Sequence, residues 1–239
     1  ILNDLSVNPI YHVTGCSLRD DICPGKDYRF VRTDIRDENE VRKLFKECRP
    51  DIVINTSALS VPDYCETHHA EAEATNVTAV ETIAHVCEQY GSRFIHLSTD
   101  FVFDGKSTRL YKEEDEAIPV NYYGVTKLKA EKIIASICSN YAIVRVVVVY
   151  GKALPGQHGN ILQLVANRLR NGETIRVVSD QWRTPTFVGD ISVGVEKLMF
   201  HTANGIYHIC GSECLTIAEI AYRVADFLKL DRSLIEPVT

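Results

Sequence analysis

The stretch Tyr141-Ala-Ile-Val-Arg-Val-Val-Val-Val149 is almost continuously apolar and rich in β-branched residues. A strand of this composition is usually buried on both faces, which is typical of a parallel sheet that helices cover on each side. The shorter run Ile52-Val-Ile-Asn55 has the same character. We therefore read residues 141–149 and 51–55 as strands of one buried, parallel sheet.

Outward from these runs, strands alternate with amphipathic helical patterns. Further strands are predicted at 10–16, 28–31 and 93–98, and helices at 38–48, 70–90 and 122–138. This alternation predicts an α/β fold with a doubly wound, Rossmann-like parallel sheet. We expect residues 1–150 to form a dinucleotide-binding domain.

After Tyr150 the regular alternation of strands and helices gives way to shorter elements in a mixed order. Helices are predicted at 160–171, 188–200 and 217–230, and strands at 174–178 and 205–210. Ligands of open α/β sheets bind beyond the carboxyl ends of the strands. We expect residues 151–239 to form mainly a small substrate-binding lobe that is incomplete at its C-terminal end.

The usual opening of a dinucleotide fold is not in the chain. Such a fold begins with a strand and a glycine-rich turn that leads into a helix. Residues 1–6 instead look like the end of that helix, and residues 10–16 like the second strand. We therefore expect the first strand and the glycine-rich loop to be absent from the given chain, which leaves a seam in the sheet.

Composition limits the partners. The chain is 45% hydrophobic and 24% charged with a net charge of −6, which argues against nucleic acid and acidic membranes as partners. No stretch approaches the roughly 20 apolar residues of a membrane span. The eight cysteines are scattered and form no CxxC pair. We expect a cytoplasmic protein with free thiols and no metal site.

The strongest chemical signal is Tyr123 and Lys127, which are four residues apart at the start of a predicted helix and so share one face. A nearby ammonium favours a phenolate, so we expect the tyrosine pKa to fall from about 10. Thr99 follows the strand at 93–98, where its hydroxyl can donate to a substrate carbonyl while Tyr123 delivers a proton. The alternative is that Ser98 and Thr99 merely cap the turn.

The segments Ser98-Thr-Asp-Phe-Val-Phe-Asp-Gly105 and Tyr123-Gly-Val-Thr-Lys-Leu-Lys-Ala-Glu131 closely resemble the dTDP-4-dehydrorhamnose reductase family, which belongs to the extended short-chain dehydrogenase/reductases. Asp180-Gln-Trp-Arg-Thr-Pro-Thr186 resembles the substrate-side segment of that family. The likeness extends along essentially the whole chain.

The resemblance implies that Thr99, Tyr123 and Lys127 are the catalytic trio. Tyr123 is then the acid that protonates the C4 oxygen as a hydride arrives from the nicotinamide. Lys127 lowers the tyrosine pKa and holds the nicotinamide ribose. The substrate-binding residues implied in this way are Thr99, Asp100, Trp182 and Arg183.

The same resemblance places Asp34 and Ile35 against the adenine, and the turn Thr56-Ser57-Ala58 beside the cofactor. Small side chains at such a turn let a dinucleotide approach the backbone closely. A second role for Asp34, equally open, is to form a turn or helix cap before residues 38–48. Tyr123 and Lys127 also count among the cofactor-binding residues.

Arg19 decides the expected cofactor. An arginine after the second strand pairs with the 2′-phosphate of NADP(H), whereas an acidic residue there binds the ribose of NAD(H). Asp20 and Asp21 follow directly and weaken the argument. NADP(H) is favoured, and NAD(H) stays open.

One departure concerns the sugar. Reductases of this family often carry a tryptophan in the strand before the Val-Tyr-Gly turn, where it packs on the sugar. Residues 145–150 contain none. Trp182, the only tryptophan, is a candidate replacement, and the alternative is a half-buried rim position.

The sequence and the resemblance leave three alternative functions open. The first is NAD(P)H-dependent reduction of a dTDP-4-keto-6-deoxy sugar in dTDP-rhamnose biosynthesis. The second is a non-catalytic regulatory protein, because the chain is also similar to the methionine adenosyltransferase β subunit around Asp104-Gly105 and Glu113-Glu-Asp115. The third is a reductase or epimerase of another nucleotide sugar. The intact trio favours an enzyme with a nucleotide-sugar substrate, and a homodimer is left open.

Overall fold

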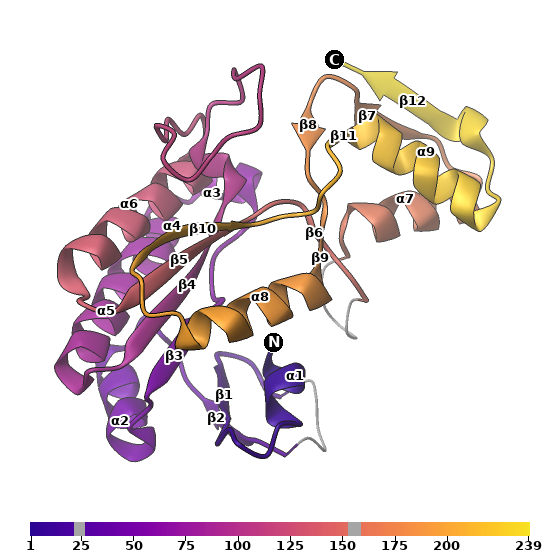
Figure 1. Ribbon diagram of the computed structural model, residues 1–239. Coiled ribbons are helices and arrows are strands. Elements are labelled where there is room, and N and C mark those ends of the chain that lie inside the picture. The colour runs from indigo at the N-terminus through magenta and orange to yellow at the C-terminus, as the bar shows by residue number, and fades with distance from the viewer. Residues whose placement is uncertain (22–26, 153–158) are drawn as a thin grey trace. The chain divides into compact units, whose positions relative to one another are not determined.

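The computed structural model describes residues 1–21, 27–152 and 159–239 (Figure 1). It divides into two compact units, Ile1–Arg145 with Ser192–His208, and Val146–Ile191 with Ile209–Thr239. This differs from the expected division at residue 150, since the segment 192–208 returns to the first unit. The reason is strand β10 (Gly205–Ile209), which lies beside β5 (Tyr141–Val146) in the main sheet.

The main sheet has the strand order β10-β5-β4-β3, with β4 at Arg93–Thr99 and β3 at Ile52–Asn55. Strands β3 and β4 run parallel, with Ile52 opposite Arg93 and Asn55 opposite His96. The prediction that residues 51–55, 93–98 and 141–149 contribute neighbouring strands to one sheet is confirmed.

Three helices pack together with this sheet: α2 (Glu38–Cys48), α5 (Ala79–Tyr90) and α6 (Tyr122–Ile137). Figure 1 shows α5 and α6 side by side. Their shared core consists of Val41, Phe45, Val80, Ile83, Ala84, Val86, Cys87, Phe94, Ala130, Ile134, Cys138 and Ile143. Complete burial of one large apolar side chain contributes roughly 1.5–3 kcal/mol, so this cluster is a main source of stability.

Local signals explain where α2 begins and ends. The Asp37 carboxylate accepts hydrogen bonds from the backbone N–H groups of Asn39 and Glu40. At the other end Arg49 adopts a left-handed conformation, with φ 43°, and stops the helix. The observed bounds match the predicted 38–48.

The helix predicted at 70–90 contains a widened turn. It consists of α4 (His69–Glu73), a π-helical turn η1 (Ala74–Thr78) and α5. A short helix that the sequence analysis did not predict, α3 (Pro62–Thr67), precedes it. π-helical turns inside α-helices often occur at functional sites.

Strands β1 (Thr14–Ser17) and β2 (Arg29–Arg32) form a separate parallel pair, preceded by α1 (Leu2–Ser6). A groove of about 1260 Å³ is lined by residues of both β1 and β3. Most of its lining is apolar, including Leu5, Val13 and Ile54.

The second unit is built on two parallel strands, β7 (Ile175–Val178) and β12 (Ile235–Val238), with helices α7 (Ile161–Arg170) and α9 (Ile217–Leu228). Two small strand pairs join β8 (Trp182–Arg183) to β11 (Leu215–Thr216) and β6 (Val149–Tyr150) to β9 (Thr186–Phe187).

The remaining elements of the described chain, in either unit, are α8 (Val188–Phe200) and the 3₁₀ turns η2 (Asp100–Val102) and η3 (Arg232–Leu234). Across the described ranges, no helix is both long and apolar enough to span a bilayer.

The predicted single strand 141–149 is interrupted. β5 ends at Val146, and Val148 has a φ of 38°. A β-branched residue at positive φ is unusual and cannot continue a strand. Thr186 binds the carbonyls of this turn, since its N–H donates to Val148 and its hydroxyl to Val147.

Candidate active site

Helix α6 begins where two chain segments approach each other closely. The Asn121 side chain accepts a hydrogen bond of 2.8 Å from the backbone N–H of Gly124 and so caps the helix. A Cβ atom on Gly124 would overlap the carbonyl oxygen of Phe101 in the turn η2. Glycine therefore allows the first turn of α6 to lie against the turn that follows Thr99.

This approach brings Thr99 and Tyr123 together. Their side chains lie near enough for the Thr99 hydroxyl to influence the tyrosine pKa, and the residues are 6% and 8% exposed. The Thr99 hydroxyl oxygen also accepts from the backbone N–H of Phe101 at 3.2 Å. Thr99 thus caps the turn and faces Tyr123 at the same time. Asp100, the other residue implicated here, is partly buried beside them.

The predicted fall in the Tyr123 pKa is wrong for this arrangement. Burial raises the pKa of Tyr123 to about 12. The Thr99 hydroxyl opposes this rise, and the Asp100 carboxylate adds to it. Lys127 does not lower the tyrosine pKa, because its amine binds other groups.

Lys127 is directed into the sheet, with 1% of the residue exposed. Its Nζ donates to the carbonyl oxygen of Leu97 at 2.7 Å and lies 2.8 Å from Nε2 of His96. Burial lowers the pKa of Lys127 to about 7, although the Glu131 carboxylate opposes the fall. The lysine can therefore exchange a proton near neutral pH.

His96 and Asn55 were missed by the sequence analysis. The Asn55 Nδ2 lies 3.1 Å from Nδ1 of His96, and its Oδ1 accepts from the backbone N–H of Ser57 at 3.0 Å. The signal was present, because each is a polar residue that directly follows apolar residues within a strand. Buried polar residues of this kind require partners.

A second buried polar group lies one helical turn further along α6. The Glu131 carboxylate accepts from Arg145 Nε and Nη2 at 3.0 and 2.7 Å, and from the Ser98 hydroxyl at 2.5 Å. The side chains of Arg145 and Glu131 are 4% and 3% exposed. This ion pair joins α6 to β5 and β4, and neither Glu131 nor Arg145 was predicted from the sequence as part of the site.

Asn76 in the π-helical turn connects the loop after β3 to α6. Its amide exchanges two hydrogen bonds with the backbone of Leu59 and donates a third, of 3.0 Å, to the Thr126 hydroxyl. Thr126 in turn donates to the carbonyl of Tyr123. The widened turn therefore helps to position the helix that carries Tyr123 and Lys127.

The expected cofactor-side residues lie in part along the groove. Ile35, Thr56 and Ser57 line it, together with Cys16 at the end of β1. Ala58 follows in the same turn, outside the groove lining.

Asp34 is engaged in a turn. Its carboxylate accepts from the Arg36 backbone N–H and guanidinium, with an ion-pair distance of 2.7 Å, and this holds the Asp34 pKa below its usual value. The cap of α2 is Asp37. The helix-cap role considered for Asp34 is therefore wrong, and the turn role is confirmed.

Arg19 lies exposed just beyond β1. Its backbone N–H donates to the Ser17 hydroxyl at 3.2 Å. In the part of the chain that the structure describes, its guanidinium has no ion-pair partner. By contrast, the Asp21 carboxylate accepts from the Tyr28 hydroxyl.

Trp182 and Arg183 belong to the second unit, on the short strand β8, where Trp182 lies opposite Thr216. Trp182 is 59% exposed. The Arg183 guanidinium donates to the carbonyl of Trp182 and to the Gln181 side chain. An exposed indole of this kind is available to stack on a ligand.

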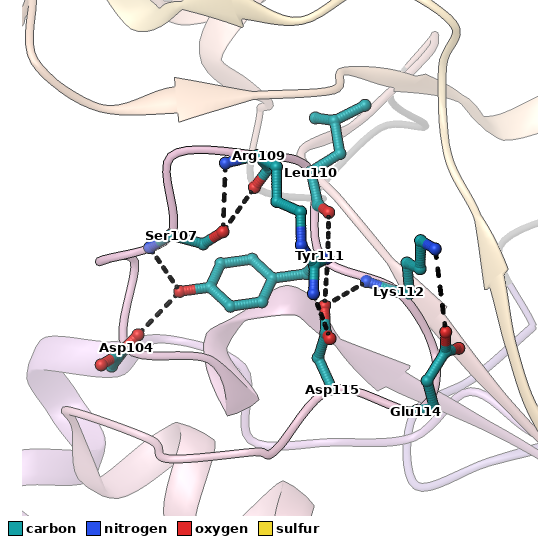
Figure 2. Close-up of polar contacts among 8 residues, drawn as sticks. All are labelled: Asp104, Ser107, Arg109, Leu110, Tyr111, Lys112, Glu114 and Asp115. Atoms are coloured by element: carbon teal, nitrogen blue, oxygen red, sulfur yellow. Dashed lines mark hydrogen bonds and ion pairs between the residues drawn. The ribbon is translucent and has the colours of Figure 1, made fainter.

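The segment after η2 forms an ordered loop (Figure 2). The Tyr111 hydroxyl donates to Asp104 at 2.7 Å and accepts from the Ser107 N–H, while Arg109 forms two hydrogen bonds with Asp115. The acidic residues shared with the methionine adenosyltransferase β subunit thus include two, Asp104 and Asp115, that stabilise this loop. Their presence follows from loop structure and does not by itself indicate a regulatory role.

A parallel α/β sheet with Thr99 at the carboxyl end of one strand, facing a Tyr-x-x-x-Lys helix, defines the class of the extended short-chain dehydrogenase/reductases. Within that class, the chain belongs to the RmlD substrate binding domain family, whose model matches residues 11–239. The resemblance inferred from the sequence is confirmed.

Individual relatives show what the family contains. The chain is 32% identical to the probable low-salt glycan biosynthesis reductase Agl14 of Haloferax volcanii, over 89% of this chain and 71% of that protein. It is 31% identical to methionine adenosyltransferase 2 subunit beta of Xenopus laevis, over 96% and 68%. A crystal structure of dTDP-4-dehydrorhamnose reductase from Bacillus anthracis str. Ames, in complex with NADP, superposes with a TM-score of 0.82 at 27% identity, covering 89% of this chain and 76% of that one.

Proposed function

We propose that this protein is an NAD(P)H-dependent reductase of a dTDP-4-keto-6-deoxy sugar. The observation that carries the proposal is the placement of Thr99, at the carboxyl end of β4, beside the buried Tyr123, which lies one helical turn from Lys127. Similarity to reductases, including one in complex with NADP, supports it.

Each residue of the site has a role in this reaction. When bound, the nicotinamide cofactor supplies the hydride that adds to C4. Thr99 donates a hydrogen bond to the C4 oxygen, and Tyr123 gives that oxygen its proton. A pKa of about 12 keeps Tyr123 protonated at neutral pH, which suits a proton donor. Lys127, with a pKa of about 7, can return a proton to the tyrosine.

The remaining assignments concern binding. Ile35 and the turn Thr56-Ser57-Ala58 hold the adenosine side of the cofactor, with Asp34 ordering the turn beside them. Arg19 pairs with a 2′-phosphate and favours NADPH over NADH. For the sugar, Asp100 is the proposed polar contact in the first unit, and Trp182 and Arg183 are the proposed contacts in the second unit.

A second candidate is a regulatory subunit, which the similarity to methionine adenosyltransferase 2 subunit beta favours. That relative and the reductases are about equally similar to this chain, so overall identity does not separate the two functions. The burial of Thr99 and Tyr123 favours the enzyme, because a regulatory surface has no need of a buried proton donor.

A turnover assay tests the proposal. The purified chain is incubated with NADPH and a panel of dTDP- and UDP-linked 4-keto sugars, and oxidation of NADPH is followed together with product formation. We expect turnover of a dTDP-4-keto-6-deoxy sugar. Turnover of a UDP sugar alone would assign another substrate, and NADPH binding without turnover of any sugar would favour the regulatory function.

A further inference from the structure

The orientation of the Asn55 amide is set by the backbone. The Ser57 N–H is a donor only, so the side-chain atom it contacts at 3.0 Å is the Asn55 oxygen. The amide nitrogen of Asn55 therefore faces Nδ1 of His96, at 3.1 Å. Since an NH₂ group offers only hydrogens, Nδ1 of His96 must be the acceptor and carries no proton.

The single proton of His96 is then on Nε2. The residue is completely buried, and burial together with the neighbouring Lys127 lowers its pKa well below the ordinary value, so the ring is neutral. A neutral imidazole with a bare Nδ1 carries its proton on Nε2. The Nε2–H bond points at the Lys127 Nζ, 2.8 Å away.

This contact requires a lone pair on Lys127. An ammonium group has three hydrogens and no acceptor, whereas a neutral amine accepts one hydrogen bond and donates two. The same nitrogen donates to the carbonyl of Leu97 at 2.7 Å. The complete set of contacts is therefore satisfied when the amine of Lys127 is uncharged.

We propose that His96 is a positioning residue that Asn55 fixes in the Nε2–H tautomer, and that it holds Lys127 as a neutral amine against β4. The proposal deepens the proposed function, on which it rests for the reaction that Lys127 serves. When Lys127 takes up a proton it loses the lone pair that His96 requires. The ammonium then turns away from His96, along the helical face it shares with Tyr123.

The charged and titratable groups around Lys127 agree with this behaviour. On α6 they are Glu131, whose carboxylate Arg145 and Ser98 already bind, and Tyr123 one turn earlier. On β4 the group is His96 itself, and Asp100 in η2 faces Tyr123. Because the Glu131 carboxylate is already bound by partners from two strands, His96 decides how the lysine is directed.

Nuclear magnetic resonance on the full chain tests the proposal without any need for turnover. Two-bond ¹H–¹⁵N correlations identify the His96 tautomer, and the ¹³Cε shift of Lys127 is followed with pH. Lys129, which is exposed and paired with Glu73, serves as an internal control with a midpoint above that of free lysine. We expect an Nε2–H tautomer for His96 and a Lys127 midpoint near 7.

Asn55→Asp reverses the direction of the hydrogen bond between residue 55 and His96. The new carboxylate accepts from Nδ1–H of His96, so Nε2 becomes an acceptor that favours the ammonium. We expect the Lys127 midpoint to rise by about one pH unit, a tenfold change in its protonation constant. His96→Phe, which removes the donor, should also raise the midpoint, and both variants should shift the pH profile of kcat.

The outcomes separate the two proposals. An Nδ1–H tautomer in the unmutated protein, or a Lys127 midpoint above 10, overturns the role of His96 whether or not the protein reduces a sugar. A correct tautomer and midpoint without turnover would leave the role of His96 intact and overturn the proposed function. A Lys127 midpoint that is unchanged in Asn55→Asp would show that Asn55 does not set the tautomer.

Discussion

A Cβ atom on Gly124 would overlap the carbonyl oxygen of Phe101 and lie 2.9 Å from Cβ of Pro119. The first turn of α6 and the turn after Thr99 are therefore as close as a glycine allows. This contact places Tyr123 beside Thr99.

Gly124→Ala should push these two turns apart. We expect a loss of about 1–3 kcal/mol in the free energy of unfolding, because added atoms in a packed site force the backbone to move. Urea denaturation measures the loss. Ser136→Ala, at an exposed position of the same helix, is the matched control and should change stability by less than about 0.5 kcal/mol. Equal stability of the two variants would contradict the close approach.

Tyr123→Phe removes the proton donor and keeps the ring. In the proposed reductase we expect kcat to fall by roughly 10²–10⁴-fold, while the fold and cofactor binding survive. The neighbouring Tyr122→Phe is the control, since that hydroxyl binds Glu73 away from Thr99 and its loss should leave kcat within a few-fold. Full activity of Tyr123→Phe on the true substrate would place the acid elsewhere.

Arg19→Ala should narrow the preference for NADPH over NADH. Loss of a charge-assisted contact to phosphate costs on the order of 1.5–3 kcal/mol, so NADPH binding should weaken while NADH binding changes little. Calorimetric titration with each cofactor measures both, and Arg42→Ala on α2 controls for the lost charge. If the unmutated protein binds both cofactors equally, Arg19 has no such role.

Glu131→Gln leaves the Arg145 guanidinium buried without a counter-charge. Breaking a buried pair from one side costs about 3–5 kcal/mol of folding free energy. The exposed pair Glu38 and Arg42 is the comparison, and Glu38→Gln should cost about 0.3–0.5 kcal/mol. Thermal and urea unfolding of the two variants should therefore differ clearly, and similar losses would mean that Arg145 finds another partner.

The lowered pKa of Lys127 predicts that the free energy of unfolding depends on pH. Its pKa is 10.5 for a solvated lysine, as in the unfolded chain, and about 7 in the folded protein, so between these limits the unfolded chain binds up to one more proton than the folded one. Stability from this group therefore rises as the pH rises from 7 to 10.5. Lys127→Met removes the effect, so the unfolding free energy of the unmutated protein relative to this variant should increase over that interval. A difference independent of pH would mean that Lys127 is charged in the folded state.

Much of the fold could be predicted because the periodicity is strong. The helices at 38–48 and 188–200 have the predicted bounds, and the buried strands lie in the predicted sheet. The misses have one local and one long-range physical cause. Val148 interrupts the long apolar run with a positive φ, and the strand 205–209 joins a sheet whose other strands lie far away in the sequence. Hydrophobic patterns contain no information about such long-range pairing.

For the candidate site, the sequence by itself determined which residue types are present and at what spacing, because Tyr123 and Lys127 share a helical face whatever surrounds them. Only the tertiary structure decided what those groups contact and how they titrate. Lys127 binds His96 and Leu97, and burial raises the Tyr123 pKa, because the strand β4 and the turn η2 pack on α6. Proton affinity depends on burial and on partners distant in the chain, and these come into existence only when the chain folds.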